Sequence, residues 1–232
     1  MSWPLGPDAL ALFDLDHTLI PFDSGMAWTR FLVERGVLPA QAEETYLGYC
    51  RQYVAGTLDI YAMHFASVSP LASVPRAQLA QWTLEFEHAM RARVPADTLA
   101  LVQRHRAAGD LCAVVTATTR FIAEPCARAF GLTEVVATEA ATVDAIPDAA
   151  LTGEIAGLPC FREHKVTRVL QWLAQRAGGA AGLDAFEQSW FYSDSVSDLP
   201  LLQAVSHPVA VRPDERLRRH ALASGWPVFD PV

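Results

Sequence analysis

The chain has 232 residues and is 51% hydrophobic, with 18 Lys and Arg against 26 Asp and Glu and a formal net charge of -8. This length and composition allow one large domain, or a core domain that carries a smaller one. The acidic balance offers no electrostatic footprint for nucleic acid or for an anionic membrane surface, so neither is expected as a partner.

The N-terminal sequence MSWPLGPDAL has no basic start followed by an apolar stretch, and the chain has no run of about 18 apolar residues. We therefore expect a cytoplasmic protein. The four cysteines form no CxxC pair and have no histidines at metal-ligand spacing, so they are expected to be reduced thiols.

The first predicted element is a strand. Residues 9–15 read ALALFDL, an apolar run that ends in acids and is typical of a strand buried on both faces of a parallel sheet. From about Met26 to Arg91 the pattern is helical, and Pro and Gly divide it into several segments. We expect a helical cap domain at residues 22–92, inserted after the first strand.

Helices and strands alternate from Pro95 onward. Strands are predicted at 111–116, 135–137, 189–193 and 208–211, and residues 140–143 and 151–155 resemble a hairpin. Helices are predicted at about 95–109 and 121–130, from near Glu163, after Asp198, and near 215–223. This alternation predicts an α/β core with a doubly wound, Rossmann-like parallel sheet, made of residues 1–21 and 93–232.

Acids follow two of the predicted strands. Asp14 and Asp16 follow the first, and residues two apart in an extended chain point to the same side, so both carboxylates can face one site. Asp194 and Asp198 follow the strand at 189–193. Ligands bind beyond the carboxyl ends of such strands, and a magnesium ion would relieve the repulsion between close acids.

Two further features indicate a site that binds an anion. Thr116, Ala117 and Thr118 follow the strand at 111–116, where hydroxyls and free N–H groups at the start of a helix would form an anion site. Lys165 lies in the first turn of a predicted helix, where a cation is disfavoured by the macrodipole unless an anion is held nearby.

The motifs DLDHT at 14–18, VVTAT at 114–118, then Lys165, then SDSVSD at 193–198 occur in this order. Together they resemble the haloacid dehalogenase-like phosphatase superfamily, and within it the branch of phosphoserine phosphatases and certain histidinol-phosphate phosphatases that carry a helical cap after the first strand. The match covers nearly the whole chain. The sequence departs from many relatives at Glu163-His164, where they have a glycine, and at Ser197, where they have an asparagine.

The resemblance implies roles for the acids. Asp14 would attack phosphorus and become an aspartyl phosphate, and Asp16 would act as general acid and base. Magnesium would be held by the Asp14 carboxylate, the Asp16 backbone carbonyl and the Asp194 carboxylate, and Asp198 would orient these ligands directly or through water.

The resemblance also implies a phosphate clamp and a substrate contact. Thr116, the Ala117 N–H and Lys165 would hold the phosphoryl oxygens. Asp23 lies nine positions after the proposed nucleophile, where phosphoserine-type relatives carry an acid that binds the substrate amine.

Structural alternatives exist for most of these positions. Thr116, Asp198 and Asp23 are also plausible helix N-caps, and Lys165 is also explained as a surface lysine. Tyr46, Tyr49 and Tyr53 share one helical face, which is more typical of core packing than of a ring-binding site. The histidines have no spacing that indicates a metal site, and His17 is expected in a turn.

The leading hypothesis is a magnesium-dependent phosphomonoesterase acting on a small phosphate ester, with histidinol phosphate preferred over phosphoserine or another small metabolite. A phosphomutase would use the same aspartyl phosphate. A phospho-acceptor signalling domain would also use an aspartate and magnesium, but it needs no long cap. A catalytically inactive binding module is disfavoured because every expected catalytic group is present. The sequence assigns no oligomeric state.

Overall fold

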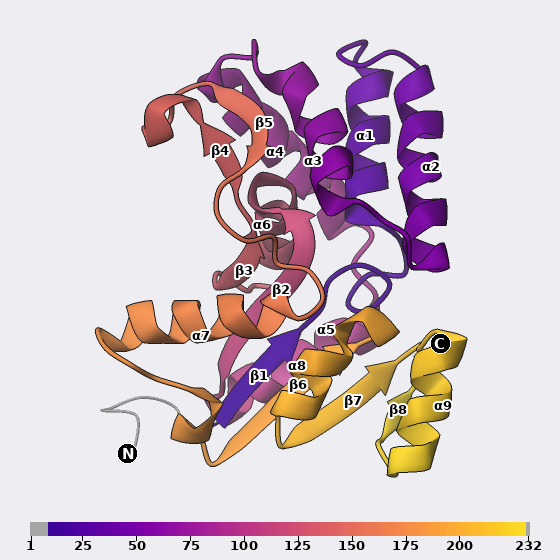
Figure 1. The fold of residues 1–232 in the computed structure, drawn as a ribbon, viewed down its shortest axis with the longest axis vertical. Helices are drawn as coiled ribbons and strands as arrows, with labels where there is room; N and C mark the ends of the chain where they lie inside the picture. The colour runs from indigo at the N-terminus through magenta and orange to yellow at the C-terminus, as the bar shows by residue number, and fades with distance from the viewer. Residues whose placement is uncertain (1–8, 231–232) are drawn as a thin grey trace.

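The computed structural model describes residues 9–230. Its centre is a sheet of six parallel strands in the order β3-β2-β1-β6-β7-β8 (Figure 1). The strands are β1 (Ala9–Phe13), β2 (Leu111–Thr119), β3 (Val135–Thr138), β6 (Gln188–Ser193), β7 (His207–Val211) and β8 (Val228–Phe229). The first strand of the chain therefore lies inside the sheet, between β2 and β6, as a doubly wound topology requires.

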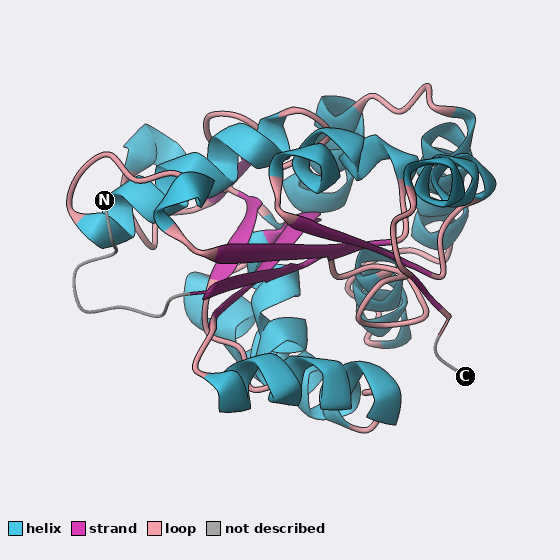
Figure 2. Ribbon diagram, turned by 90° about the horizontal axis from the view of Figure 1, so that it is seen from below, coloured by secondary structure: helices cyan, strands magenta, loops and turns pink. Residues whose placement is uncertain are grey.

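Helices cover both faces of this sheet, as Figure 2 shows from below. The side chains of β1 alternate between two apolar clusters: Ala11 and Phe13 belong to one, and Leu10 and Leu12 to the other. The first cluster includes α5 (Ala96–Ala108) and α6 (Arg120–Ala129). The second includes α7 (His164–Ala177), α8 (Leu199–Ala204) and α9 (Glu215–Ser224). The predicted α/β fold is confirmed.

Four helices lie between β1 and α5 in the chain and sit beyond the carboxyl end of the sheet (Figure 1). They are α1 (Ser24–Glu34), α2 (Gln41–Ala55), α3 (Ile60–Val68) and α4 (Arg76–Arg91). Trp28 of α1 makes edge-to-face contacts with Phe86 of α4 and Phe121 of α6. The helical insertion thus shares an apolar cluster with a helix of the sheet core. Its division from the core as a domain of residues 22–92 stays a prediction, and residues 1–8 and 231–232 of the predicted core lie outside the described residues.

The antiparallel hairpin of β4 (Ala140–Thr142) and β5 (Leu151–Ile155) is also confirmed. It packs against the helical insertion, which the sequence did not indicate. A Cβ atom at Gly153 would lie 2.8 Å from Cβ of Ser69, and His64 Nε2 of α3 lies 3.2 Å from the Glu154 carbonyl oxygen. The His64 Nδ1 atom lies 3.2 Å from Thr119 Oγ1 at the end of β2, so one histidine joins the cap, the hairpin and the sheet.

One strand boundary and one additional strand differ from the predictions. Strand β2 continues to Thr119 and α6 begins at Arg120, so Thr116, Ala117 and Thr118 do not begin a helix. The two-residue strand β8 was not predicted, because it is too short to carry a periodic signal. Over residues 9–230, no helix has the length and apolar character needed to span a membrane.

Candidate active site

Asp14 lies one residue beyond β1, and its N–H donates to the Tyr192 carbonyl oxygen at 2.9 Å, which continues the pairing of β1 with β6. The residue is 7% exposed. Its Oδ1 atom accepts a hydrogen bond from Lys165 Nζ at 2.8 Å, and its Oδ2 atom accepts one from Thr18 Oγ1 at 3.0 Å. The predicted nucleophile is therefore fixed at the carboxyl end of the central strand by a cation and a hydroxyl.

Asp16 is held by two different donors. Its Oδ1 atom accepts from the N–H of Ser24 at 2.6 Å, and its Oδ2 atom accepts from Thr118 Oγ1 at 2.7 Å. Ser24 is the first residue of α1, so the predicted proton shuttle is anchored to the entry of the cap as well as to β2. His17, between the two acids, adopts φ 59° in a turn, which confirms the expected turn residue.

Thr18 connects the two acidic loops. Its Oγ1 atom lies 3.0 Å from Asp14 Oδ2 and 3.2 Å from Asp194 Oδ1, and it accepts a hydrogen bond from the Asp194 N–H at 3.0 Å. Thr18 is buried and belongs to the first motif, but no role was assigned to it from the sequence. The structure thus brings Asp14 and Asp194 to the same hydroxyl, although they are 180 residues apart.

Lys165 is buried, with 2% of its surface exposed, which rules out the surface-lysine alternative. Its Nζ atom donates to Asp14 Oδ1 at 2.8 Å and to Asp198 Oδ2 at 2.6 Å. The Asp198 side chain also accepts from Ser193 Oγ at 2.7 Å and makes no N-cap hydrogen bond to α8. The capping interpretation of Asp198 is therefore wrong, because its carboxylate is turned toward Lys165.

Residues 116–118 form a bulge rather than a helix start. Val115 pairs with Val136 and Thr119 pairs with Thr138, so these three residues of β2 oppose the single residue Ala137 of β3. Thr116 is not an N-cap: it is buried, and its Oγ1 atom accepts from the Thr118 N–H at 3.1 Å. Thr118 was expected at the anion site, but its hydrogen bond to Asp16 was not predicted, because nothing in its spacing indicates a partner 102 residues away.

The bulge also contacts the cap. Ala117 packs against an apolar cluster of Leu58, Ile60 and Phe161, which joins the segment before α3 to the loop before α7. The predicted phosphate-binding backbone therefore lies where the cap meets the core.

Burial governs the electrostatics of this site. It raises the pKa of Asp14, raises that of Asp16 to about 6, and raises that of Asp198. The pKa of Asp194 is raised well above its usual range, by burial first and then by the charges of Asp14 and Asp198. Burial opposes the charge of Lys165, but Asp14 and Asp198 raise its pKa well above the ordinary value, so the lysine is cationic.

These carboxylates fit a divalent cation. The site contains four acids, Asp14, Asp16, Asp194 and Asp198, and one buried lysine, Lys165, which contacts two of them, so it is short of positive charge. Oxygen donors of this kind suit Mg²⁺. Among residues 9–230, no three His, Cys, Asp or Glu side chains converge to hold a metal on their own. A cation at this position would consequently need further oxygen ligands, such as the proposed Asp16 carbonyl.

Asp23 is the N-cap of α1, and its Oδ1 atom accepts from the Met26 N–H at 2.7 Å, so the capping interpretation is confirmed. The same oxygen accepts from the Tyr46 hydroxyl of α2 at 3.0 Å. Within the described residues, Oδ2 accepts no hydrogen bond and remains available. The charge of Asp23 contributes to the raised pKa of Asp16, after burial, which indicates that the two carboxylates are neighbours.

Comparison with known proteins agrees with this geometry. The family model of haloacid dehalogenase-like hydrolases matches residues 11–203. A histidinol-phosphatase of Neisseria meningitidis serogroup C is 40% identical over 224 residues, covering 95% of this chain and 98% of that protein. A phosphoserine phosphatase of Mycobacterium tuberculosis is 30% identical over 98% of this chain and 72% of its own length.

Solved structures show the same fold. A protein of unknown function from Bordetella pertussis superimposes with a TM-score of 0.85 at 43% identity, covering 97% of this chain and 99% of that one. A substrate-bound phosphoserine phosphatase superimposes with a TM-score of 0.63 at 18% identity, covering 98% and 95%. The chain belongs to the haloacid dehalogenase-like hydrolase family and is one of its phosphatases, a phosphoric monoester hydrolase.

Proposed function

We propose that the chain is a magnesium-dependent phosphomonoesterase that works through an aspartyl phosphate on Asp14, with histidinol phosphate as its substrate. The observation that carries the proposal is the placement of Asp14 at the end of β1, where Lys165 and Thr18 bond its two oxygens. A carboxylate fixed in this way has a defined direction of attack, which is the main requirement in phosphoryl transfer.

In the first step an Asp14 oxygen forms a bond to phosphorus while the ester P–O bond breaks. Asp16 gives its proton to the departing alkoxide. Its raised pKa of about 6 keeps a protonated fraction available near neutral pH, which suits a general acid. In the second step Asp16 removes a proton from the water that attacks phosphorus, and the aspartyl phosphate is hydrolysed.

The proposed phosphate clamp consists of Thr116, the Ala117 N–H and Lys165. The bulge at 116–118 releases its backbone from regular pairing with β3, which supports a role for the Ala117 N–H as an anion donor. Lys165 would neutralise charge on the phosphoryl oxygens while it still contacts Asp14 and Asp198. Magnesium, held by Asp14, Asp194 and the Asp16 carbonyl with Asp198 nearby, would supply further positive charge at phosphorus.

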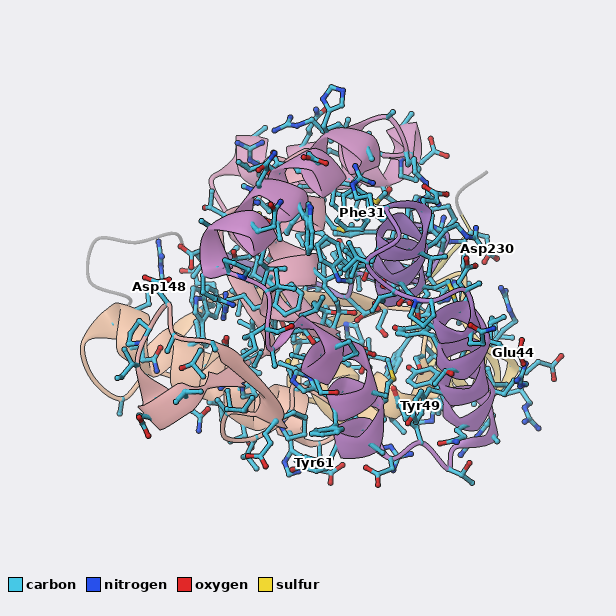
Figure 3. All side chains as sticks on the ribbon, turned by 90° about the horizontal axis from the view of Figure 1, so that it is seen from above. Phe31, Glu44, Tyr49, Tyr61, Asp148 and Asp230 are labelled. Atoms are coloured by element: carbon cyan, nitrogen blue, oxygen red, sulfur yellow. The ribbon has the colours of Figure 1, made fainter. Side chains whose placement is uncertain are left out.

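The proposed substrate contact is Asp23. Its unbonded oxygen and its proximity to Asp16 suit the ammonium group of an amino-alcohol phosphate. Two cap arginines, Arg30 and Arg51, form exposed ion pairs with Glu43 and Glu44, and Glu44 lies at the outer edge of the molecule in Figure 3. These two arginines are therefore already paired with cap glutamates, which makes them less suited to bind a substrate carboxylate and favours histidinol phosphate over phosphoserine. The histidinol-phosphatase at 40% identity supports the same choice.

The test is a panel of histidinol phosphate, phosphoserine, sugar phosphates and p-nitrophenyl phosphate, assayed with magnesium and with a chelator. We expect turnover only with metal, and loss of essentially all turnover in Asp14→Asn. Asp148→Asn, in the exposed loop of the hairpin, is the matched control. Turnover without metal, or full activity of Asp14→Asn, would contradict the proposal, and isomerisation of a sugar phosphate without phosphate release would indicate a mutase.

Asp23→Asn tests the substrate assignment separately. We expect KM for histidinol phosphate to rise about tenfold or more, because a hydrogen bond to a charged group is lost. KM for p-nitrophenyl phosphate, which has no amine, should stay within about twofold. Equal changes for both esters would show that Asp23 acts as a helix cap alone.

A further inference from the structure

A tyrosine of the cap reaches across to the acidic loop of the core. Tyr53 lies in the last turn of α2, and its hydroxyl oxygen is 2.7 Å from Ser195 Oγ and 2.9 Å from Ser197 Oγ. The two serines lie between Asp194 and Asp198, more than 140 residues further along the chain. The expectation that the tyrosine face of α2 is typical of core packing does not account for this hydroxyl contact.

The three hydroxyls close a ring. Tyr53 donates to Ser195, Ser195 donates to Ser197 at 3.0 Å, and Ser197 has its own hydrogen left to donate to Tyr53. Each oxygen then donates once and accepts once within the ring, an arrangement in which hydrogen bonds polarise and strengthen one another. Burial and the charges of Asp198 and Asp194 raise the pKa of Tyr53, so the phenol keeps the proton that the ring requires.

The ring is tied to the acids on either side of it. Ser195 Oγ also accepts from the Ser197 N–H at 3.2 Å, which fixes the short 3-10 turn Val196–Asp198. The Ser195 N–H donates to Ser193 Oγ at 3.2 Å, and Ser193 donates to Asp198. The cap hydroxyl is thus connected through one loop to the carboxylate that holds Lys165.

We propose that Tyr53 is a positioning residue. Its hydroxyl completes the hydrogen-bonded ring with Ser195 and Ser197 when the cap packs against the core. The completed ring holds Asp194 and Asp198 in the arrangement needed for metal binding and phosphoryl transfer. This inference rests on the proposed function of the acidic loop. It also gives Ser197 a role, because the hydroxyl that stands where many relatives have an asparagine is the second contact of the cap tyrosine.

Other contacts hold α2 against the core without the hydroxyl. The Tyr53 ring lies 6.1 Å from the Phe161 ring, and Arg162 Nη2 donates to the Gly56 carbonyl oxygen at 2.9 Å, at the C-terminal end of α2. Tyr53→Phe therefore removes the hydroxyl that closes the hydrogen-bonded ring and leaves the packing of α2 against the core intact. Tyr61→Phe, on the exposed face of α3 at the rim of the molecule in Figure 3, is the matched control.

The experiment is a double-mutant cycle of Tyr53→Phe and Ser197→Ala. Two quantities are measured: kcat on histidinol phosphate, and the affinity for Mg²⁺ alone, by calorimetry without substrate. We expect each single variant to lose about fivefold to tenfold in kcat or in Mg²⁺ affinity, with KM for the ester changed less than about twofold. The double variant should lose no more than the larger single loss, because either change opens the same ring.

Losses that multiply in the double variant would overturn the proposal, and so would a Tyr53→Phe variant equal to Tyr61→Phe in both quantities. If the wild-type protein hydrolyses no ester in the panel, the proposed function fails, and the cycle is then decided on Mg²⁺ affinity alone. The two failures are therefore distinguishable.

Discussion

At the scale of single residues, the pKa of Asp16 is set by the groups around it. Burial and the charge of Asp23 raise its pKa, while hydrogen bonds from Ser24 and Thr118 lower it. These opposing effects leave the pKa at about 6, closer to neutrality than that of an ordinary aspartate. Such a balance suits the proposed role of Asp16, which gives up a proton and takes one back in the same turnover.

Thr118→Val tests this balance. The Thr118 hydroxyl donates to the ionised carboxylate and so stabilises it, and its removal should raise the pKa of Asp16. Because the proposed mechanism requires a protonated Asp16 in the first step, the alkaline limb of the kcat/KM profile should move to higher pH, by roughly one unit. The measurement is a pH profile at fixed, saturating magnesium.

The control is Thr45→Val, which removes an exposed hydroxyl that bonds only the Gln41 carbonyl of its own helix. Its profile should match that of the wild type. A limb that stays in place, or moves to lower pH, in Thr118→Val would rule out Asp16 as the acid.

At the scale of elements, α1 and α2 meet through a glycine. A Cβ atom at Gly25 would lie 1.9 Å from the Tyr46 hydroxyl oxygen, so only glycine allows this tyrosine to reach Asp23. At Gly48, in the middle of α2, the same added Cβ would meet no atom within 4 Å apart from its chain neighbours and the backbone of its own helix. The two glycines therefore serve different purposes, although both lie in helices of the cap.

The same substitution should consequently have opposite effects at the two positions. Gly25→Ala should lower the free energy of unfolding by about 1–3 kcal/mol, because the rigid phenol ring must be displaced. Gly48→Ala should raise it by roughly 0.5–1 kcal/mol, since alanine is the better helix former. Urea unfolding of the two variants checks both signs, and a neutral or stabilising Gly25→Ala would contradict the packing described for Tyr46.

At the scale of the whole molecule, the clustered acids of the active site lower the stability of the folded chain. Asp194 is held close to Asp14 and Asp198, and burial together with these two charges raises its pKa well above the usual range. Such a carboxylate destabilises the folded chain without a cation and binds a cation that is supplied. Stability and function therefore compete at this position.

Asp194→Asn should separate the two effects. Without metal the variant should unfold at a higher temperature than the wild type, because one of the repelling charges is gone. Saturating magnesium should stabilise the wild type, by about 2.7 kcal/mol at a concentration one hundredfold above Kd, and should stabilise the variant much less. Thermal unfolding with and without magnesium measures this, with Asp148→Asn as control. A variant less stable than the wild type without metal would contradict the argument.

The sequence predicted the parts of this site that follow from local order. Asp14, Asp16 and Asp194 stand where apolar runs end, and the ends of parallel strands meet at one edge of a sheet. It did not predict the hydrogen bonds from Thr118 to Asp16 and from Tyr53 to Ser195. Each joins segments more than 100 residues apart, and no spacing in the sequence indicates such a contact. The prediction from the sequence ended β2 three residues early, at 116 instead of Thr119, because the bulge at 116–118 depends on pairing with β3.

The position of β1 also bears on how the protein is made. Of the six strands in the sheet, β1 is synthesised first, yet its two neighbours, β2 and β6, begin only at residues 111 and 188. Pairing over such separations forms slowly, whereas α1 and α2 pack against each other and are neighbours in the sequence. We expect these helices to gain structure during translation, while the strand that carries Asp14 stays unpaired on its β6 side until most of the chain has been synthesised. We expect an apolar strand that stays unpaired for this long to bind a chaperone.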